Sequence, residues 1–163
     1  MIVTFKSMLV PPGMGSTYVV LGDLYTILAT AKDTGGEYGV YEAVMQPQST
    51  IPPHIHDQTD EAHYILEGEF EYQIDDQTIV ATPGTFLNFT KGQCHSFKNI
   101  GSKPAKMLVW VTPAGGEQFF VEAGQPVTLP LNEEERSLLG VVNPAEFEKA
   151  VVIASKYVQF PTS

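Results

Sequence analysis

Apolar and polar residues alternate with a period of two through the middle of the chain, which is the spacing of a β-strand with one buried face. Residues 69–74, with the sequence EFEYQI, show the pattern most clearly, because every second residue is apolar and the others are glutamate or glutamine. One face of this strand is therefore predicted to pack against a core, and the acidic face is predicted to meet solvent.

Further short segments rich in β-branched and aromatic residues lie on both sides, separated by turn-forming residues such as Pro83-Gly84. The predicted strands are residues 17–22, 24–31, 38–45, 79–82, 85–90, 95–100 and 106–112. Many short strands separated by glycine- and proline-containing turns favour an all-β sandwich or barrel.

The last third of the chain has a helical pattern instead. Residues 143–158 predict a helix, with Asn143 as N-cap and Pro144 at the first helical position. One face of this helix would carry Phe147, Ala150, Val151, Ala154 and Val158. Residues 132–139 predict a shorter helix with acidic residues in its first turn. We expect both helices to pack on the outside of the β domain or across a dimer contact.

The length of 163 residues fits one domain spanning residues 1–163. Within it, the β core is expected at about residues 38–113 and the helical extension at about 130–158. The formal net charge of −10, from 19 acidic and 9 basic residues, repels phosphate groups, so we expect neither nucleic acid nor an anionic membrane surface as a partner.

Three features of the sequence predict a cytoplasmic protein. Residues 1–16 lack the uninterrupted apolar stretch of a secretory signal. No apolar run approaches the ~20 residues that span a bilayer. Cys94 is the single cysteine, so no internal disulfide can form.

Three of the four histidines lie in residues 52–74, among many acidic residues. His54 and His56 are two residues apart, so in a strand their side chains project to the same side. After a predicted turn at residues 57–60, Glu61 begins the next strand, from which its carboxylate can reach back toward both imidazoles. The remaining histidine, His95, stands at the start of a later predicted strand and could complete the group.

Three imidazoles and one carboxylate suit a divalent transition metal such as Fe, Mn, Ni, Co, Cu or Zn, whereas Mg and Ca prefer oxygen ligands. In a six-coordinate ion, two positions would stay open for water, dioxygen or a chelating substrate. Each residue also has an ordinary explanation, since a His-x-His pair can occur in any loop and Glu61 could be a surface charge. Cys94 neighbours His95 but points to the opposite face of a regular strand, so we predict a structural role for it.

Residues 54–68 resemble the first motif of the cupin superfamily, which reads His-x-His, four residues, Glu, six residues and Gly. The second motif is also present: Gly84, five residues, residues 90–92, two residues, His95, three residues and Asn99. The chain departs from the family at Thr90, where a proline is usual, and at Gln48, where the first motif normally opens with a glycine. Neither departure removes a ligand.

The resemblance is to single-domain cupins of the quercetin dioxygenase-like type. It implies a jelly-roll β-barrel or sandwich with short C-terminal helices and one divalent transition metal inside. Carried over by position, the metal ligands would be His54, His56, Glu61 and His95. Because cupins often pair, the resemblance also implies a homodimer.

His63 lies two residues after Glu61 and should share its inward face. It could simply fill space or form a hydrogen bond in the pocket wall, or it could act as a base or contact the substrate. Glu61 could itself act as a base. The candidate catalytic residues are therefore Glu61 and His63. The candidate wall residues are Phe97, Phe70, Tyr72, Ile74, Phe89 and Trp110.

These features favour a metal-dependent dioxygenase acting on a small enolic or aromatic substrate. One alternative is a metal-dependent isomerase of a small metabolite, which would need more basic residues near the motifs than the chain provides. The sole arginine, Arg136, is far from them in the sequence. The other alternative is a non-catalytic small-molecule-binding cupin in which the metal only stabilises the fold.

Overall fold

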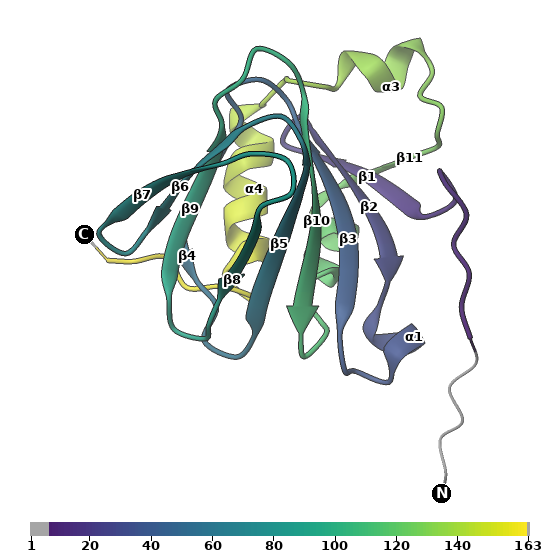
Figure 1. The fold of residues 1–163 in the computed structure, drawn as a ribbon. Helices are drawn as coiled ribbons and strands as arrows, with labels where there is room; N and C mark the ends of the chain where they lie inside the picture. The colour runs from purple at the N-terminus through teal and green to yellow at the C-terminus, as the bar shows by residue number, and fades with distance from the viewer. Residues whose placement is uncertain (1–6, 163) are drawn as a thin grey trace, which may run out of the picture.

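The computed structural model describes residues 7–162 and contains two antiparallel β-sheets that face each other as a sandwich (Figure 1). Residues 1–6, part of the amino-terminal segment that is predicted not to be a secretory signal, lie outside the described range. The predicted all-β class with short C-terminal helices is confirmed, and within residues 7–162 the strands form a sandwich rather than a closed barrel.

The larger sheet has seven strands in the order β11-β1-β2-β3-β10-β5-β8. Their bounds are β1 Ser16–Val20, β2 Asp23–Ala29, β3 Gly39–Met45, β5 Asp60–Glu67, β8 Phe86–Phe89, β10 Ala105–Thr112 and β11 Gln125–Val127. The smaller sheet has the order β4-β9-β6-β7, with β4 Thr50–Ile55, β6 Phe70–Ile74, β7 Gln77–Ala81 and β9 Cys94–Asn99.

The alternation of apolar and polar residues decides which side chains enter the space between the sheets. In β6, Phe70 and Tyr72 are fully buried while Glu71 and the preceding Glu69 are exposed, as the pattern predicts. The other fully buried large apolar side chains come from the larger sheet and are Met45, Ile65, Phe89, Met107 and Val109. Burying each such side chain contributes roughly 1.5–3 kcal/mol, so this core is the main source of stability.

Gly68, the last residue of the first motif, connects β5 to β6 with a φ of +79°. A Cβ atom at this position would lie 2.4 Å from the Cβ of Ala105 on β10. Both the left-handed backbone and this close approach to β10 require glycine.

Four helices accompany the sheets in the described range: α1 Ala31–Thr34, α2 Gln118–Ala123, α3 Glu133–Ser137 and α4 Pro144–Ala154. As predicted, Asn143 caps α4, its side chain accepting a hydrogen bond of 2.9 Å from the backbone N–H of Ala145. The helix ends at Ala154, four residues before the predicted boundary. No helix among residues 7–162 has the length and apolar character needed to cross a bilayer.

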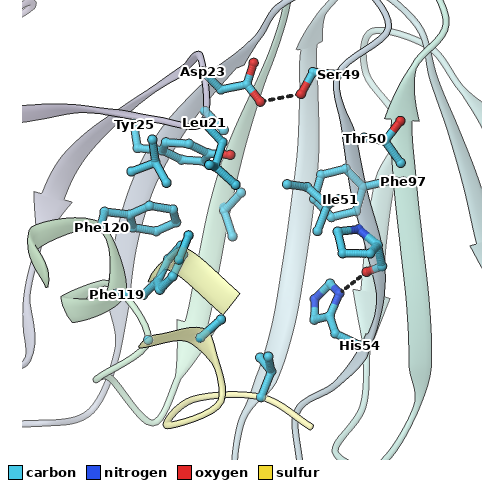
Figure 2. Close-up of a pocket in the computed structure, with 18 of the residues that line it drawn as sticks. Leu21, Asp23, Tyr25, Ser49, Thr50, Ile51, His54, Phe97, Phe119 and Phe120 are labelled. Carbon is cyan, nitrogen blue, oxygen red and sulfur yellow. Dashed lines mark hydrogen bonds between the residues drawn. The ribbon is translucent and has the colours of Figure 1, made fainter. Parts of the chain in front are cut away.

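A cavity of about 430 Å³ lies between the sheets (Figure 2). Its walls include Ile51 and Phe97 from the smaller sheet, Phe119 and Phe120 from α2, and residues of α4. The α4 residues are Phe147, Ala150, Val151 and Ala154, which together with Val158 formed the predicted apolar face. The apolar face of α4 therefore borders this cavity.

Candidate metal centre

The two sheets bring the four proposed ligands to one end of this cavity. His54 on β4 is the direct cross-strand partner of His95 on β9, so their imidazoles project from neighbouring positions of the smaller sheet. The β4–β9 register shifts between Ile51 and His54, and the residues in this irregularity, Pro52 and Pro53, have no backbone N–H to donate. Glu61 reaches the same point from β5 in the opposite sheet.

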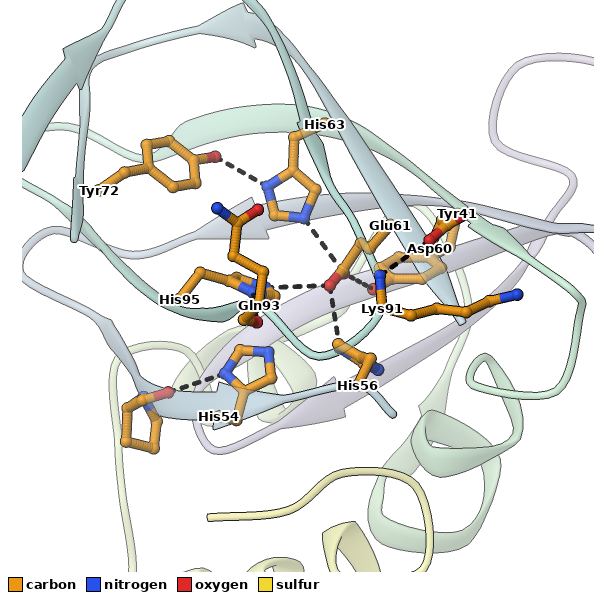
Figure 3. Close-up of polar contacts among 11 residues, drawn as sticks. Tyr41, His54, His56, Asp60, Glu61, His63, Tyr72, Lys91, Gln93 and His95 are labelled. Carbon is orange, nitrogen blue, oxygen red and sulfur yellow. Dashed lines mark hydrogen bonds and ion pairs between the residues drawn. The ribbon is translucent and has the colours of Figure 1, made fainter. Parts of the chain in front are cut away.

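The ligand atoms of His54, His56, Glu61 and His95 all lie within 4.8 Å of one another (Figure 3). The Nε2 atoms of His56 and His95 are 2.9 and 3.1 Å from Oε2 of Glu61. Two ligand atoms at right angles, each about 2.1 Å from one ion, would be about 3 Å apart. The spacing and the nitrogen-rich donor set therefore both fit a transition metal ion.

His54 is held in the form that a metal requires. Its Nδ1 lies 2.8 Å from the carbonyl oxygen of Pro52, which can accept only if Nδ1 carries the proton, so the lone pair of Nε2 is free. Burial, reinforced by the neighbouring His95, lowers the pKa of His54 to about 4. The imidazole is consequently neutral near pH 7 and able to act as a ligand.

Glu61 is buried but ionised. Burial by itself raises the pKa of its carboxyl group, but hydrogen bonds from His56, His63 and His95 outweigh that effect and hold the pKa well below the ordinary value. A buried carboxylate is costly unless it is paired, so this group needs the positive charge or donors that surround it.

The two oxygens of Glu61 have different partners. Oε2 faces His56 and His95, whereas Oε1 lies 3.1 Å from Nε2 of His63 and accepts a 3.4 Å hydrogen bond from the hydroxyl of Tyr41. On the far side of the His63 ring, Nδ1 is 2.8 Å from the hydroxyl of Tyr72.

Burial, reinforced by the charge of Glu61, raises the pKa of Tyr72 far above its ordinary value, so the phenol keeps its proton. Tyr72 can then donate to Nδ1 of His63, which leaves Nε2–H to donate to Glu61. Every polar atom in this chain of three side chains is thereby satisfied.

His63 shares the inward direction of Glu61, as its spacing predicts, but it is fully buried and does not border the cavity. Its ring packs edge-on against Phe89 and Phe97, with centroid distances of 5.1 and 5.0 Å. Phe97 borders the cavity, and Phe89 instead stacks on His95 at 4.1 Å. Trp110 was a candidate wall residue, and this expectation was wrong, because its side chain is 48% exposed and packs beside Tyr38 outside the cavity.

Sequence reasoning missed two polar residues at the opposite end of the cavity, Asp23 and Tyr25 (Figure 2). Asp23 follows a glycine and has the sequence signature of a turn, yet its side chain is only 2% exposed. Nothing local in the sequence indicates that β2 faces the same space as the histidines.

Comparison with known proteins places these features in a family. A cupin domain model matches residues 41–112, a range that contains all four proposed ligands. Protein SchB of Streptomyces halstedii is 33% identical over 94 residues, covering 56% of this chain and 67% of that protein. The chain belongs to the cupin superfamily. Quercetin 2,3-dioxygenase of Bacillus subtilis is also similar to this cupin, with 31% identity over 114 residues, 70% of the chain.

The match covers less than two thirds of the length of two curated relatives. This cupin spans 34% of the length of the Bacillus enzyme and 60% of polyketide synthase CurC of Streptomyces cyaneus, to which it is 32% identical over 94 residues. Among solved structures, a predicted oxalate decarboxylase from Thermotoga maritima has a TM-score of 0.61 at 18% identity, covering 65% of this chain and 99% of that one. KdgF from Halomonas sp. has a TM-score of 0.60 at 15% identity, covering 69% and 98%. At these identities the structures support the fold alone.

Proposed function

We propose that this cupin is a metal-dependent dioxygenase acting on a small enolic or aromatic substrate, with one divalent transition metal held by His54, His56, Glu61 and His95. The observation that carries the proposal is the convergence of these ligand atoms at one end of a largely apolar cavity. The 31% identity to a quercetin 2,3-dioxygenase supports the same reaction class.

A bound ion would supply Lewis acidity at this point, and any of the candidates other than Zn would also supply one-electron chemistry. The donor set leaves Fe, Mn, Ni, Co, Cu and Zn as candidates. His54, His56 and Glu61 border the cavity, whereas His95 approaches from behind, stacked on Phe89. A substrate entering the cavity would therefore meet the ligand cluster on its His54–Glu61 side.

Glu61 would receive a proton from the substrate on Oε2 after giving up its metal bond, because it alone combines a carboxylate with a position at the cavity wall beside the histidines. His63 does not reach the cavity, so in this proposal it acts through Glu61. Its Nε2–H, with the hydroxyl of Tyr41, holds Oε1 and leaves Oε2 directed at the ligand cluster.

The cavity walls favour a flat, apolar molecule. Ile51, Phe97, Phe119 and Phe120 would pack against such a substrate and exclude water from the reacting end. Among the described residues that border the cavity, none is lysine or arginine. This wall chemistry is unfavourable for a phosphorylated sugar, which counts against the isomerase alternative.

The test is oxygen consumption by protein loaded separately with Fe, Mn, Ni or Co and offered a panel of enols and flavonols. We expect uptake with at least one metal and substrate, and loss of that uptake in Glu61→Gln. Turnover of a metabolite under strict anaerobiosis would favour an isomerase. Absence of any turnover, with chelation lowering only the thermal stability, would favour the non-catalytic binding module.

Cytoplasmic location and homodimer formation stay predictions from the sequence and from the resemblance. Light scattering on the purified protein tests the second of these, because a monomeric mass across a range of concentrations would exclude a stable homodimer.

A further inference from the structure

The end of the cavity opposite the histidines carries a second group of polar side chains. Figure 2 places Asp23 and Ser49 together at this end, with Tyr25 just below them and His54 at the other end. Leu21, Ile51 and the two phenylalanines of α2 lie between the two polar ends.

Asp23 is held firmly in place. Its Oδ1 accepts a 2.7 Å hydrogen bond from the backbone N–H of Gln46, and its Oδ2 accepts one of 2.5 Å from the hydroxyl of Ser49. These bonds organise the turn between β3 and β4. A carboxylate can accept about four hydrogen bonds, so acceptor capacity remains for a further donor.

Tyr25 has a hydroxyl group that the fold does not use. The residue is only 7% exposed, and its ring stacks on Phe120 with a centroid distance of 4.2 Å. Within residues 7–162 no side chain or backbone group forms a hydrogen bond with this hydroxyl, although the same range leaves no completely buried side-chain nitrogen or oxygen without a partner. The hydroxyl must therefore be reachable from the cavity that Tyr25 borders.

The protonation of Tyr25 suits a hydrogen-bond donor. Burial, reinforced by the charge of Asp23, raises the pKa of the phenol well above its ordinary value. The group keeps its proton at any physiological pH. It can donate to a ligand oxygen or accept from a ligand hydroxyl, while Asp23 beside it can only accept when ionised.

The two polar ends are separated by the width of several strands. Glu61 is on β5 and Tyr25 on β2, and β10 and β3 lie between them. Tyr41 of β3 lies in this gap, because its ring centroid is 6.3 Å from that of Tyr25 and its hydroxyl is 3.4 Å from Oε1 of Glu61. A molecule that touches both ends must therefore extend along the cavity past the side chain of Tyr41.

We propose that Tyr25 and Asp23 form a second polar subsite that binds a hydroxyl group at the far end of the substrate. The inference rests on the proposed function, since the other end of the same molecule would face His54 and Glu61. It narrows the substrate class to flat aromatic compounds with a metal-binding oxygen group at one end and a hydroxyl group at the other.

The test compares two probes that differ only in this distal hydroxyl, 3-hydroxyflavone and 3,4′-dihydroxyflavone. Their affinities for metal-loaded protein are measured by fluorescence titration without oxygen, so that binding is read independently of turnover. We expect wild type to bind the dihydroxy compound about tenfold or more tightly, because a site built to bond a hydroxyl discriminates against the analogue that lacks it.

The decisive variant is Tyr25→Phe, which keeps the ring on Phe120 and removes only the hydroxyl. It should abolish the preference by weakening the dihydroxy compound while leaving the affinity for 3-hydroxyflavone within about twofold of wild type. Tyr157→Phe is the matched control, since Tyr157 also borders the cavity but its hydroxyl donates to Glu122. This control should keep the wild-type ratio.

Equal affinities in wild type, an unchanged ratio in Tyr25→Phe, an equal loss for both probes, or no binding of either probe would each overturn the subsite. The outcome is separate from that of the oxygen-uptake test. If the protein discriminates between the two probes but consumes no oxygen, the subsite stands and the dioxygenase proposal is refuted. If it consumes oxygen with other enols but does not discriminate between the probes, the dioxygenase proposal stands and the subsite is refuted.

Discussion

His63 contacts one carboxylate oxygen of Glu61, whereas His56 and His95 contact the other. Nε2 of His63 lies 3.1 Å from Oε1, while Oε2 is the oxygen near His56 and His95. Oε2 of Glu61 is therefore available to the proposed ion, whereas Oε1 is bonded within the protein. We therefore expect His63 to position the ligand Glu61 and not to bind the ion itself.

Replacing His63 with leucine should weaken metal binding by about 10–100-fold, the usual effect of losing a hydrogen bond to a ligand. Oε1 of Glu61 would lose its closest hydrogen-bond donor, so the carboxylate would be free to rotate and Oε2 would no longer be held toward the ion. Competition against a chelator of known affinity measures the change. His63→Gln retains an N–H donor and should recover part of the affinity, and equal affinity of the leucine variant and wild type would contradict a positioning role.

Substitution of the proposed ligands themselves should have a larger effect. Glu61→Gln removes the charge and His95→Ala removes an imidazole, so each should lower metal affinity by more than about 100-fold while circular dichroism stays that of a β protein. Cys94→Ala is the matched control, because Cys94 neighbours His95 yet takes no part in the cluster. Full metal occupancy in Glu61→Gln and His95→Ala, measured by elemental analysis, would place the ion elsewhere.

The contribution of Asp23 to the free energy of unfolding should fall as pH rises from about 4 to about 6. Burial raises its pKa from 3.8 to about 6, opposed by the hydrogen bonds from Ser49 and Gln46. The folded protein therefore holds a proton that the unfolded chain has lost in this window, and the stabilisation present below pH 4 disappears as pH passes 6. Two pKa units correspond to roughly 3 kcal/mol.

The measurement is urea unfolding of metal-free wild type and Asp23→Asn at several values between pH 4 and pH 7. The free energy of unfolding of wild type should fall relative to that of the variant as pH rises. Parallel curves for the two proteins would show that Asp23 has an ordinary pKa in the folded state.

The glycines of the two motifs should differ in their cost of substitution. Gly68→Ala meets a left-handed backbone and a contact of 2.4 Å with Ala105, so we expect a loss of about 2–4 kcal/mol. Gly84 has a φ of +92° but no atom within 4 Å of an added Cβ, so Gly84→Ala should cost only about 1–2 kcal/mol. Thermal unfolding of both variants checks the order, and an equal loss would show that Ala105 moves aside.

The strands were predictable from local spacing, and the convergence of the four candidate ligands was predictable from the resemblance to the cupin motifs. Alternation places Phe70 and Tyr72 inside without knowledge of the partner strand, and the motif spacing brings His95 to His54 and Glu61 although 34 residues separate it from Glu61. The direction of Trp110 was not predictable in this way. In an almost wholly apolar strand such as β10, alternation cannot say which face is buried until the neighbouring sheet is known.

The distant half of the cavity depends on topology and was missed for that reason. Tyr25 faces Phe120 only because β2 lies beside β3 and α2 packs over the same space, relations that no short stretch of sequence encodes. The short elements α1, α2 and β11 were also missed, since segments of three to six residues carry too little periodicity to be recognised.

The most direct test of the metal centre is anomalous diffraction at the absorption edge of the bound metal, from crystals of protein loaded with one ion. The account predicts a single strong peak about 2.1 Å from a nitrogen atom of each of His54, His56 and His95 and from Oε2 of Glu61, with Oε1 still bonded to His63. A peak away from this cluster, or none in protein shown to contain metal, would contradict it.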